Sequence, residues 1–260
     1  MEKLLNELVE KLKTAAGANL KSVILYGSAA TDEFHAGYSD LNVMCVLERM
    51  DPENLEKLNP AGQWWVGKGH PAPMIFTLED LRNAADVFAI EFLDIKAKRR
   101  VLFGEDDFAD LDVPMSLHAH QVERELRINL IRLRQNYLTF PPKPKRLMQL
   151  MTASLSTFFT LFRHALIALG EKPPQSKREV ADRLATLLSF DSQPFRTLLD
   201  VREKKLAEKD VDAAATFRSY LESLLRAEDE FDRWLDSQKS KVKSPYDGRA
   251  SRDESGATES

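Results

Sequence analysis

The sequence predicts an α+β fold, with a mixed sheet and flanking helices first and an all-α helical bundle after it. Two apolar, partly β-branched runs, 22–26 and 43–47, have the length of short strands. A third short apolar run, Val101 to Gly104, lies before the point where the chain changes character. From Met115 onward only helical periodicity is found. We therefore expect a sheet domain over residues 1–112, a helical bundle over 113–236 and a disordered tail over 237–260.

Composition limits the possible partners of the chain. Its 260 residues suffice for one large or two modest domains. The formal net charge of −4 provides no field that attracts nucleic acid, which favours a small acceptor or a protein partner. The single cysteine, Cys45, is expected to be a buried apolar residue, and a chain with one cysteine suits a reducing cytoplasm. The first residues lack a signal-peptide pattern, and we expect no membrane-spanning run.

A glycine-serine pair and two oxygen-bearing side chains mark the candidate site. Gly27-Ser28 ends the first apolar run, and a glycine there lets backbone N–H groups approach a phosphate closely. Asp40 and Asn42 stand two residues apart where the second apolar run begins, so on a strand both side chains face the same way. A phosphate cradle facing two oxygen ligands is the arrangement that a metal–triphosphate requires.

The order Gly27-Ser28, then Ser39-Asp40-x-Asn42, resembles the Gly-Ser…Asp-x-Asp signature of the nucleotidyltransferase superfamily. That superfamily includes the aminoglycoside nucleotidyltransferases and the small "minimal" bacterial ones. The resemblance covers roughly the first hundred residues. It implies that an NTP is the substrate, that Mg²⁺ is the cofactor, and that a nucleoside monophosphate is transferred to a hydroxyl of a small molecule or a protein. Gly27 and Ser28 would bind the nucleotide, and Asp40, helped by Asn42, would hold the metal.

The sequence departs from this signature at two of three acidic positions. Asn42 replaces the second acid, and a carboxamide ligates Mg²⁺ without contributing charge. The superfamily takes a third carboxylate from a neighbouring strand as a base, but the counterpart expected here, residues 70–77, contains no acid. Glu91 and Asp94, spaced i,i+3, are the nearby acids that could replace it. Alternatively they belong to a solvated or ion-paired face beside Lys96, Lys98, Arg99 and Arg100, a basic run that could instead contact phosphates.

Two hypotheses follow from these departures. In the first, the chain is a nucleotidyltransferase with Asp40 as its catalytic acid. In the second, it is a nucleotide-binding or protein-interaction module that keeps the fold without the activity, and its apolar bundle serves docking or formation of a homodimer. A carboxylate beside Asp40 would support the enzyme, whereas Met74 or a proline filling that space would support the module.

Further elements are expected on both sides of the site. In the first part we expect a helix that ends at Gly17 and a helix that starts at Asp51-Pro52 and fades near 59–60. A strand at 73–77 follows, and Thr77 is the expected N-cap of the next helix. An acidic linker is expected at 108–114. Trp64 and Trp65 either cover the sheet edge or stack on a base. Bundle helices are expected around the stripe Leu126–Tyr137, then at 147–169 (the central helix, with His164 in its core), 176–188, 191–206 and 210–235.

Overall fold

A computed structural model describes residues 1–30 and 40–242, with side chains up to residue 238. The chain divides into two compact units, Met1–His118 and a second unit that starts at Ala119. The division lies six residues after the expected one because the expected linker 108–114 belongs to the first unit. Its residues Phe108, Leu111 and Val113 are buried in the core of that unit. The acidic side chains between them concealed this apolar spacing.

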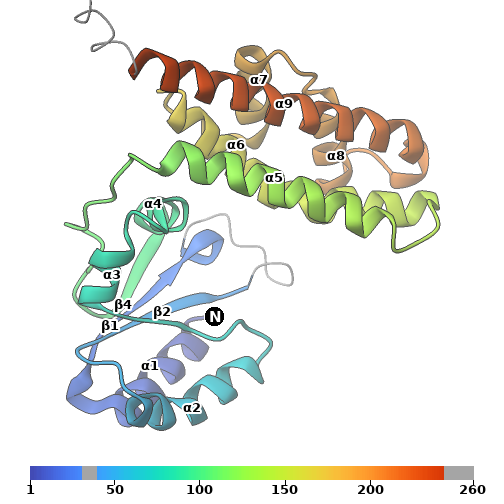
Figure 1. Cartoon of the computed structure of the whole chain (residues 1–260). Coiled ribbons are helices and arrows are strands. Elements are labelled where there is room, and N and C mark those ends of the chain that lie inside the picture. Colours follow the sequence, from blue (N-terminus) through green and yellow to red (C-terminus); the bar gives the residue numbers. More distant parts are fainter. Residues whose placement is uncertain (31–39, 243–260) are drawn as a thin grey trace, which may run out of the picture. The chain divides into compact units, whose positions relative to one another are not determined.

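The first unit is built on a four-stranded mixed sheet (Figure 1). Its strands are β1 (Leu20–Tyr26), β2 (Asn42–Leu47), β3 (Met74–Thr77) and β4 (Arg99–Gly104), in the order β3-β2-β1-β4. β1 runs antiparallel to both β2 and β4, whereas β2 and β3 are parallel. The predicted α+β fold with a mixed sheet is therefore confirmed.

Helices cover both faces of this sheet (Figure 1). α1 (Glu2–Ala16) and α2 (Pro52–Val66) pack on the face that receives Val43, Cys45 and Leu47 of β2. The short helices α3 (Leu78–Ala84) and α4 (Ala89–Ala97) lie on the face that receives Met44 and Val46. Strand side chains alternate between faces, so β2 is buried on both sides. Cys45 is fully buried, as expected, and burial raises the pKa of its thiol to about 12.

Helix ends agree with the sequence at three places and differ at one. α1 ends at Gly17, which has φ +54°, Asp51 caps α2 through the Asn54 N–H, and Thr77 caps α3 in a capping box. The expectation that α2 fades near 59–60 is wrong, because α2 continues through Pro60 to Val66. A proline inside a helix costs about 3 kcal/mol. Burial of Leu58, Ala61 and Trp65 against the sheet offsets a cost of this size.

Trp64 and Trp65 lie in different environments. Trp65 is fully buried in the core under the sheet, so its ring is not available to a nucleobase. Trp64 is half-buried and lies 4.8 Å from the Lys11 ammonium and 5.6 Å from that of Lys68. The interpretation that these rings cover the sheet is therefore confirmed for Trp65.

The second unit contains only helices among its described residues. These are α5 (His118–Tyr137, whose first residue belongs to the first unit), α6 (Pro144–Ala168), α7 (Lys177–Leu188), α8 (Gln193–Arg202) and α9 (Ala213–Val242), with a 3₁₀ turn at Glu208–Asp210. α8 ends four residues early because Lys204 has φ +59° and the N–H groups of the next two residues bond back to Asp200. α9 extends past the expected end at Leu235, so 237–242 of the expected tail is helical. Residues 243–260 lie outside the described part.

α6 is the central helix of this bundle. It contacts α7, α8 and α9, as expected of the central helix. Its buried residues lie mainly on one broad side, and Gln149, Ala153, Ser156 and Thr157 are exposed on the other. His164 is 1% exposed within it, as expected. By length and composition α6 could span a membrane, contrary to the expectation that no run approaches that length, yet half of its apolar window is buried inside the bundle. Packing against three helices explains this apolarity without a membrane.

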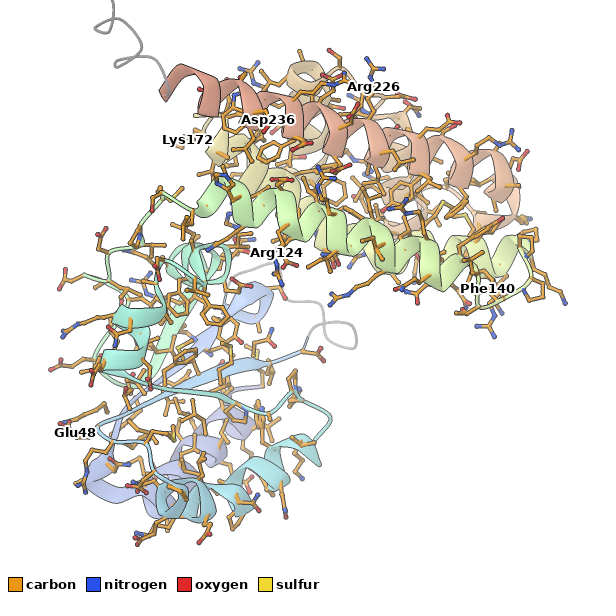
Figure 2. The ribbon with its side chains drawn as sticks, viewed as in Figure 1. Glu48, Arg124, Phe140, Lys172, Arg226 and Asp236 are labelled. Atoms are coloured by element: carbon orange, nitrogen blue, oxygen red, sulfur yellow. The ribbon has the colours of Figure 1, made fainter. Side chains whose placement is uncertain are left out.

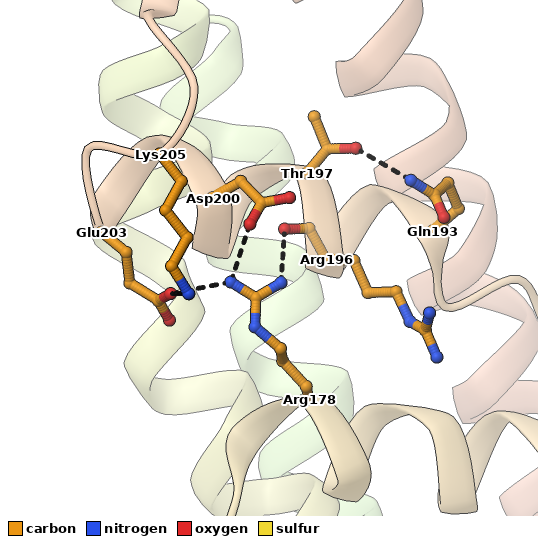
Figure 3. Close-up of polar contacts among 7 residues, drawn as sticks. All are labelled: Arg178, Gln193, Arg196, Thr197, Asp200, Glu203 and Lys205. Atoms are coloured by element: carbon orange, nitrogen blue, oxygen red, sulfur yellow. Dashed lines mark hydrogen bonds and ion pairs between the residues drawn. The ribbon is translucent and has the colours of Figure 1, made fainter.

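Arginines join the bundle helices at the surface. Arg178 of α7 donates to Asp200 and Glu203, each at 2.8 Å, and to the carbonyl of Arg196 (Figure 3). Lys205 also pairs with Glu203, and Lys205 followed by Arg178 lowers the pKa of the Glu203 carboxyl. Arg127 of α5 contacts Glu228 at 3.0 Å and Asp232 at 2.8 Å on α9. These contacts fix α7 against α8 and α5 against α9.

Gly104 provides a test of the sheet. It has φ +77°, and a Cβ added there would stand 1.9 Å from the Lys21 carbonyl oxygen, so Gly104→Ala must displace β4 from β1. We expect the variant to lose at least about 2 kcal/mol of unfolding free energy, measured by urea titration. Gly69→Ala is the matched control, because Gly69 has φ +91° with nothing within 4 Å of the added Cβ. Equal losses in both variants would show that backbone strain alone, without the clash, sets the cost.

Candidate functional site

The Gly27-Ser28 turn leaves the central strand at the edge where β2 begins. Gly27 has φ +79°, a conformation that favours glycine, and residues Gly27–Ala30 form one 3₁₀ turn. The Gly27 N–H donates to the carbonyl of Lys98 at 3.0 Å. The turn is therefore tied to the end of α4, and the predicted tight turn after the first strand is found.

Asn42 lies directly beside this turn. It pairs with Tyr26 in the β1–β2 ladder, and a Cβ on Gly27 would stand 3.5 Å from its Nδ2 atom. Asp40 precedes the strand and is exposed, whereas Asn42 is half-buried. Leu41 and Val43 are buried in the cluster on the opposite face, as predicted. The fold thus brings Gly27, Asn42 and the backbone carrying Asp40 to one edge of the sheet; residues 31–39, including Ser39, lie outside the described part.

The neighbouring strand contributes an apolar side chain where a third carboxylate was sought. β3 pairs in parallel with β2, and Met74 stands opposite Met44, two residues beyond Asn42 on the same face. The Tyr26 hydroxyl donates to the Met74 sulfur at 2.9 Å, and burial raises the pKa of Tyr26. Within the described ranges, no group of three or more His, Cys, Asp or Glu is arranged to hold a metal ion.

Glu91 and Asp94 lie on α4, on the helix whose end bonds to Gly27. Glu91 is exposed and Asp94 is half-buried. Neither belongs to a three-member metal-binding group in the described part of the chain. The suggestion that one of them replaces the third carboxylate therefore stays a prediction that this geometry does not support.

The basic run near β4 is largely occupied by contacts inside the first unit. Arg99 forms two 2.8 Å bonds with Asp106, and Arg100 forms bonds of 2.9 and 3.0 Å with Glu2. Lys96 donates to the carbonyl of Leu111. The ion-paired interpretation therefore fits Arg99 and Arg100 better than contact with phosphates, although their partners are not the acids of α4.

One residue of the site edge was missed from the sequence. His70, in the loop before β3, accepts the backbone N–H of Leu41 at its Nδ1 atom, 3.5 Å away. Its ring lies 4.6 Å from that of Trp65. His70 could be found only from the parallel pairing of β2 and β3, which places the residues preceding both strands at one edge of the sheet. A single sequence does not reveal this pairing.

A separate cavity lies at the other end of β2. It has a volume of about 610 Å³ and is lined by residues that follow β2 and β3, including Arg49 and Arg82. Glu48, also on its wall, directly follows β2 and marks that end of the strand (Figure 2). With about 3.3 Å per strand residue, the cavity is about 20 Å from Asn42. It is therefore not the space beside the Gly27-Ser28 turn.

Comparisons with known proteins agree with this arrangement. A family model described as a nucleotidyltransferase domain matches residues 1–104. The crystal structure of spectinomycin adenyltransferase AAD(9) from Enterococcus faecialis, with ATP and spectinomycin, is similar with a TM-score of 0.51 at 15% identity. The match covers 89% of this chain and 99% of that one. No curated protein matched in sequence. The resemblance to the nucleotidyltransferase superfamily is confirmed, and at this identity the structural match shows the fold.

The Arg99–Asp106 pair supports the segment that receives the Gly27 N–H, and it should depend on pH. Bonding to Arg99 lowers the pKa of the Asp106 carboxyl. Its stabilisation is therefore complete above the unfolded pKa of about 3.9 and is lost as the pH falls through the lower folded pKa. We expect Asp106→Asn to cost about 0.5–1 kcal/mol at pH 7, since the pair is partly exposed, and less at pH 3.

Urea unfolding at both pH values measures this effect, with Asp110→Asn as the exposed control. A cost for Asp106→Asn that is the same at pH 7 and pH 3 would contradict a role of the Asp106 charge.

Proposed function

We propose that this chain, whose residues 1–104 carry a nucleotidyltransferase domain, transfers a nucleoside monophosphate from an NTP to a hydroxyl of a small-molecule acceptor. The observation that carries the proposal is the contact between Gly27 and Asn42. It supports the proposal because the Gly27-Ser28 turn, the candidate phosphate site, lies next to the segment with the two candidate metal ligands. Gly27 and Ser28 would bind the phosphates, and Asp40 would be the catalytic carboxylate that holds the metal.

The side chains present suit one Mg²⁺ ion. Mg²⁺ binds oxygen ligands, keeps several waters and commonly takes one or two carboxylates together with substrate phosphates. The Asp40 carboxylate and the Asn42 carbonyl meet this requirement for a single ion. Two ions would need a larger set of ligands, and the described residues form no group of three or more His, Cys, Asp or Glu arranged to hold a metal. When bound, Mg²⁺ neutralises phosphate charge and orients the triphosphate.

The protein's own contribution is positioning. The Gly27 N–H is bonded to Lys98, so the turn has a fixed direction before a nucleotide binds. A glycine at this position leaves the Asn42 amide uncovered on the side of the turn. Groups held in place in this way bind a triphosphate with little further loss of conformational entropy. Such positioning, together with charge stabilisation, supplies most of the rate acceleration in phosphoryl and nucleotidyl transfer.

The similar adenyltransferase supports the choice of substrate class. Its structure contains ATP and spectinomycin, a nucleotide and a small-molecule acceptor. We propose the same two classes for this chain, with a protein hydroxyl as the second choice of acceptor. A cytoplasmic location, formation of a homodimer and the lack of a membrane or nucleic-acid partner remain proposals from the sequence.

A second candidate function rests on the Tyr26–Met74 contact. Met74 stands on the site face of the strand from which the superfamily takes its third carboxylate, and the Tyr26 hydroxyl bonds to it. A methionine cannot accept a proton from an acceptor hydroxyl. This observation favours a nucleotide-binding or protein-interaction module in which transfer is impaired.

Nucleotide binding tests the metal role of Asp40. We expect wild type to bind ATP or GTP more tightly with Mg²⁺, and Asp40→Ala to lose about tenfold or more of that gain, because it removes the charge that attracts the ion. Calorimetry with and without Mg²⁺ measures both affinities, with Asp110→Ala as an exposed-carboxylate control. Mg²⁺-dependent binding that survives unchanged in Asp40→Ala would refute the metal role.

Restoring acids separates the two candidate functions. Asn42→Asp should raise Mg²⁺ affinity about tenfold by adding a charge beside Asp40, whereas Asn59→Asp on the exposed side of α2 should not. Transfer is followed as pyrophosphate release over a panel of hydroxyl acceptors. Release by wild type supports the enzyme. Release that requires both Asn42→Asp and Met74→Glu supports the impaired module.

A further inference from the structure

We infer that His70 is a positioning residue for the site: it holds the peptide that joins Asp40 to Leu41 and thereby restrains Asp40 beside Asn42, which the β1–β2 ladder holds. This inference rests on the proposed function, in which those two residues meet the metal–triphosphate. His70 itself is assigned no contact with substrate. Its effect passes through one backbone hydrogen bond.

The first step is the anchoring of the imidazole ring. The ring packs at 4.6 Å and a tilt of 36° on the indole of Trp65. Trp65 is fully buried among residues of α1, α2 and the sheet, so its ring cannot shift without disturbing that core. The face of His70 is therefore held by a rigid neighbour.

The second step is the need for an acceptor at Leu41. The β2–β3 pairing runs from Met44–Met74 to Leu47–Thr77 and does not extend back to Leu41. The Leu41 residue is only 3% exposed, so its N–H cannot rely on free water. A buried N–H without a partner costs about 1–3 kcal/mol. The Nδ1 atom of His70, 3.5 Å away, supplies the acceptor that β3 does not.

The third step is what this bond does to the site. The Leu41 N–H belongs to the peptide that joins Asp40 to Leu41, so the bond restrains the backbone next to Asp40, whereas Asn42 is held by its ladder pair with Tyr26. Asp40 precedes the first ladder pair, Tyr26–Asn42, and has no strand pairing of its own. The His70 bond is thus the nearest restraint on the Asp40 backbone from the β3 side among the described residues.

The same bond argues against His70 as the missing base. To accept the Leu41 N–H, Nδ1 must carry a lone pair, which places the proton of the neutral ring on Nε2. The remaining nitrogen is then a donor and cannot take a proton from an acceptor hydroxyl. Positioning is the role that the hydrogen bond leaves to this side chain.

Two substitutions separate the acceptor atom from the ring. His70→Phe keeps an aromatic ring against Trp65 but removes the acceptor. His70→Asn removes the ring but keeps an oxygen within reach of the Nδ1 position. Amide hydrogen exchange at Leu41 tests the bond directly, without any ligand. We expect protection in wild type and His70→Asn and its loss in His70→Phe, and equal exchange in all three would overturn the inference.

ATP binding then tests the consequence for the site. We expect His70→Phe to weaken binding in the presence of Mg²⁺ about five- to tenfold, binding without Mg²⁺ to stay within about twofold, and His70→Asn to recover most of the loss. A loss of the same size with and without Mg²⁺, or no recovery in His70→Asn, would indicate a general effect on folding and overturn the positioning role.

A double-variant cycle keeps the two proposals apart. In an Asp40→Ala background, His70→Phe should have no further effect on the Mg²⁺-dependent part of binding, because the residue it positions is gone. Additive losses would overturn the inference while leaving the metal role of Asp40 intact. If wild type shows no Mg²⁺-dependent binding, the proposed function fails, and hydrogen exchange at Leu41 still decides whether His70 holds that peptide.

Discussion

The antiparallel ladder between β1 and β2 is the constraint on which the first unit depends. Its register pairs Tyr26 with Asn42, and this single pairing sets the Gly27-Ser28 turn beside Asn42. The ladder also determines which face each residue of β2 meets, because a shift by one residue would exchange the two cores. Both faces are buried, so such a shift would require both cores to repack.

Contacts between residues far apart in the sequence hold the segments around the Gly27-Ser28 turn and the start of β2. The Lys98 carbonyl ties the turn to the end of α4, Arg99 ties β4 to Asp106, and His70 ties the start of β2 to the core through Trp65. Each joins segments that are separated in the sequence, and His70 in addition packs on the buried ring of Trp65. The site edge is thus held from three directions by residues that are not part of the signature itself.

The sequence predicts the parts of the fold that local chemistry decides. Apolar runs located all four strands, and Asp51, Thr77 and Gly17 marked helix ends through caps that involve near neighbours. The continuation of α2 through Pro60, the burial of Phe108 and the contact of His70 could not be predicted, because each depends on tertiary packing. In the site, the Gly27-Ser28 turn and Asn42 were found and Met74 was named as a residue that could fill the space of the third carboxylate, whereas the contact of Tyr26 with Met74 depends on strand pairing.

The burial of Cys45 has a practical consequence. Its thiol lies in the middle of β2 and, with a pKa near 12, is almost wholly protonated at neutral pH, so it reacts slowly with alkylating reagents. It is also the chain's one cysteine. A cysteine introduced at an exposed position will therefore take up a fluorophore or spin label selectively, while the native residue remains in place. Distances within each unit can be measured in solution on a protein whose core is unaltered.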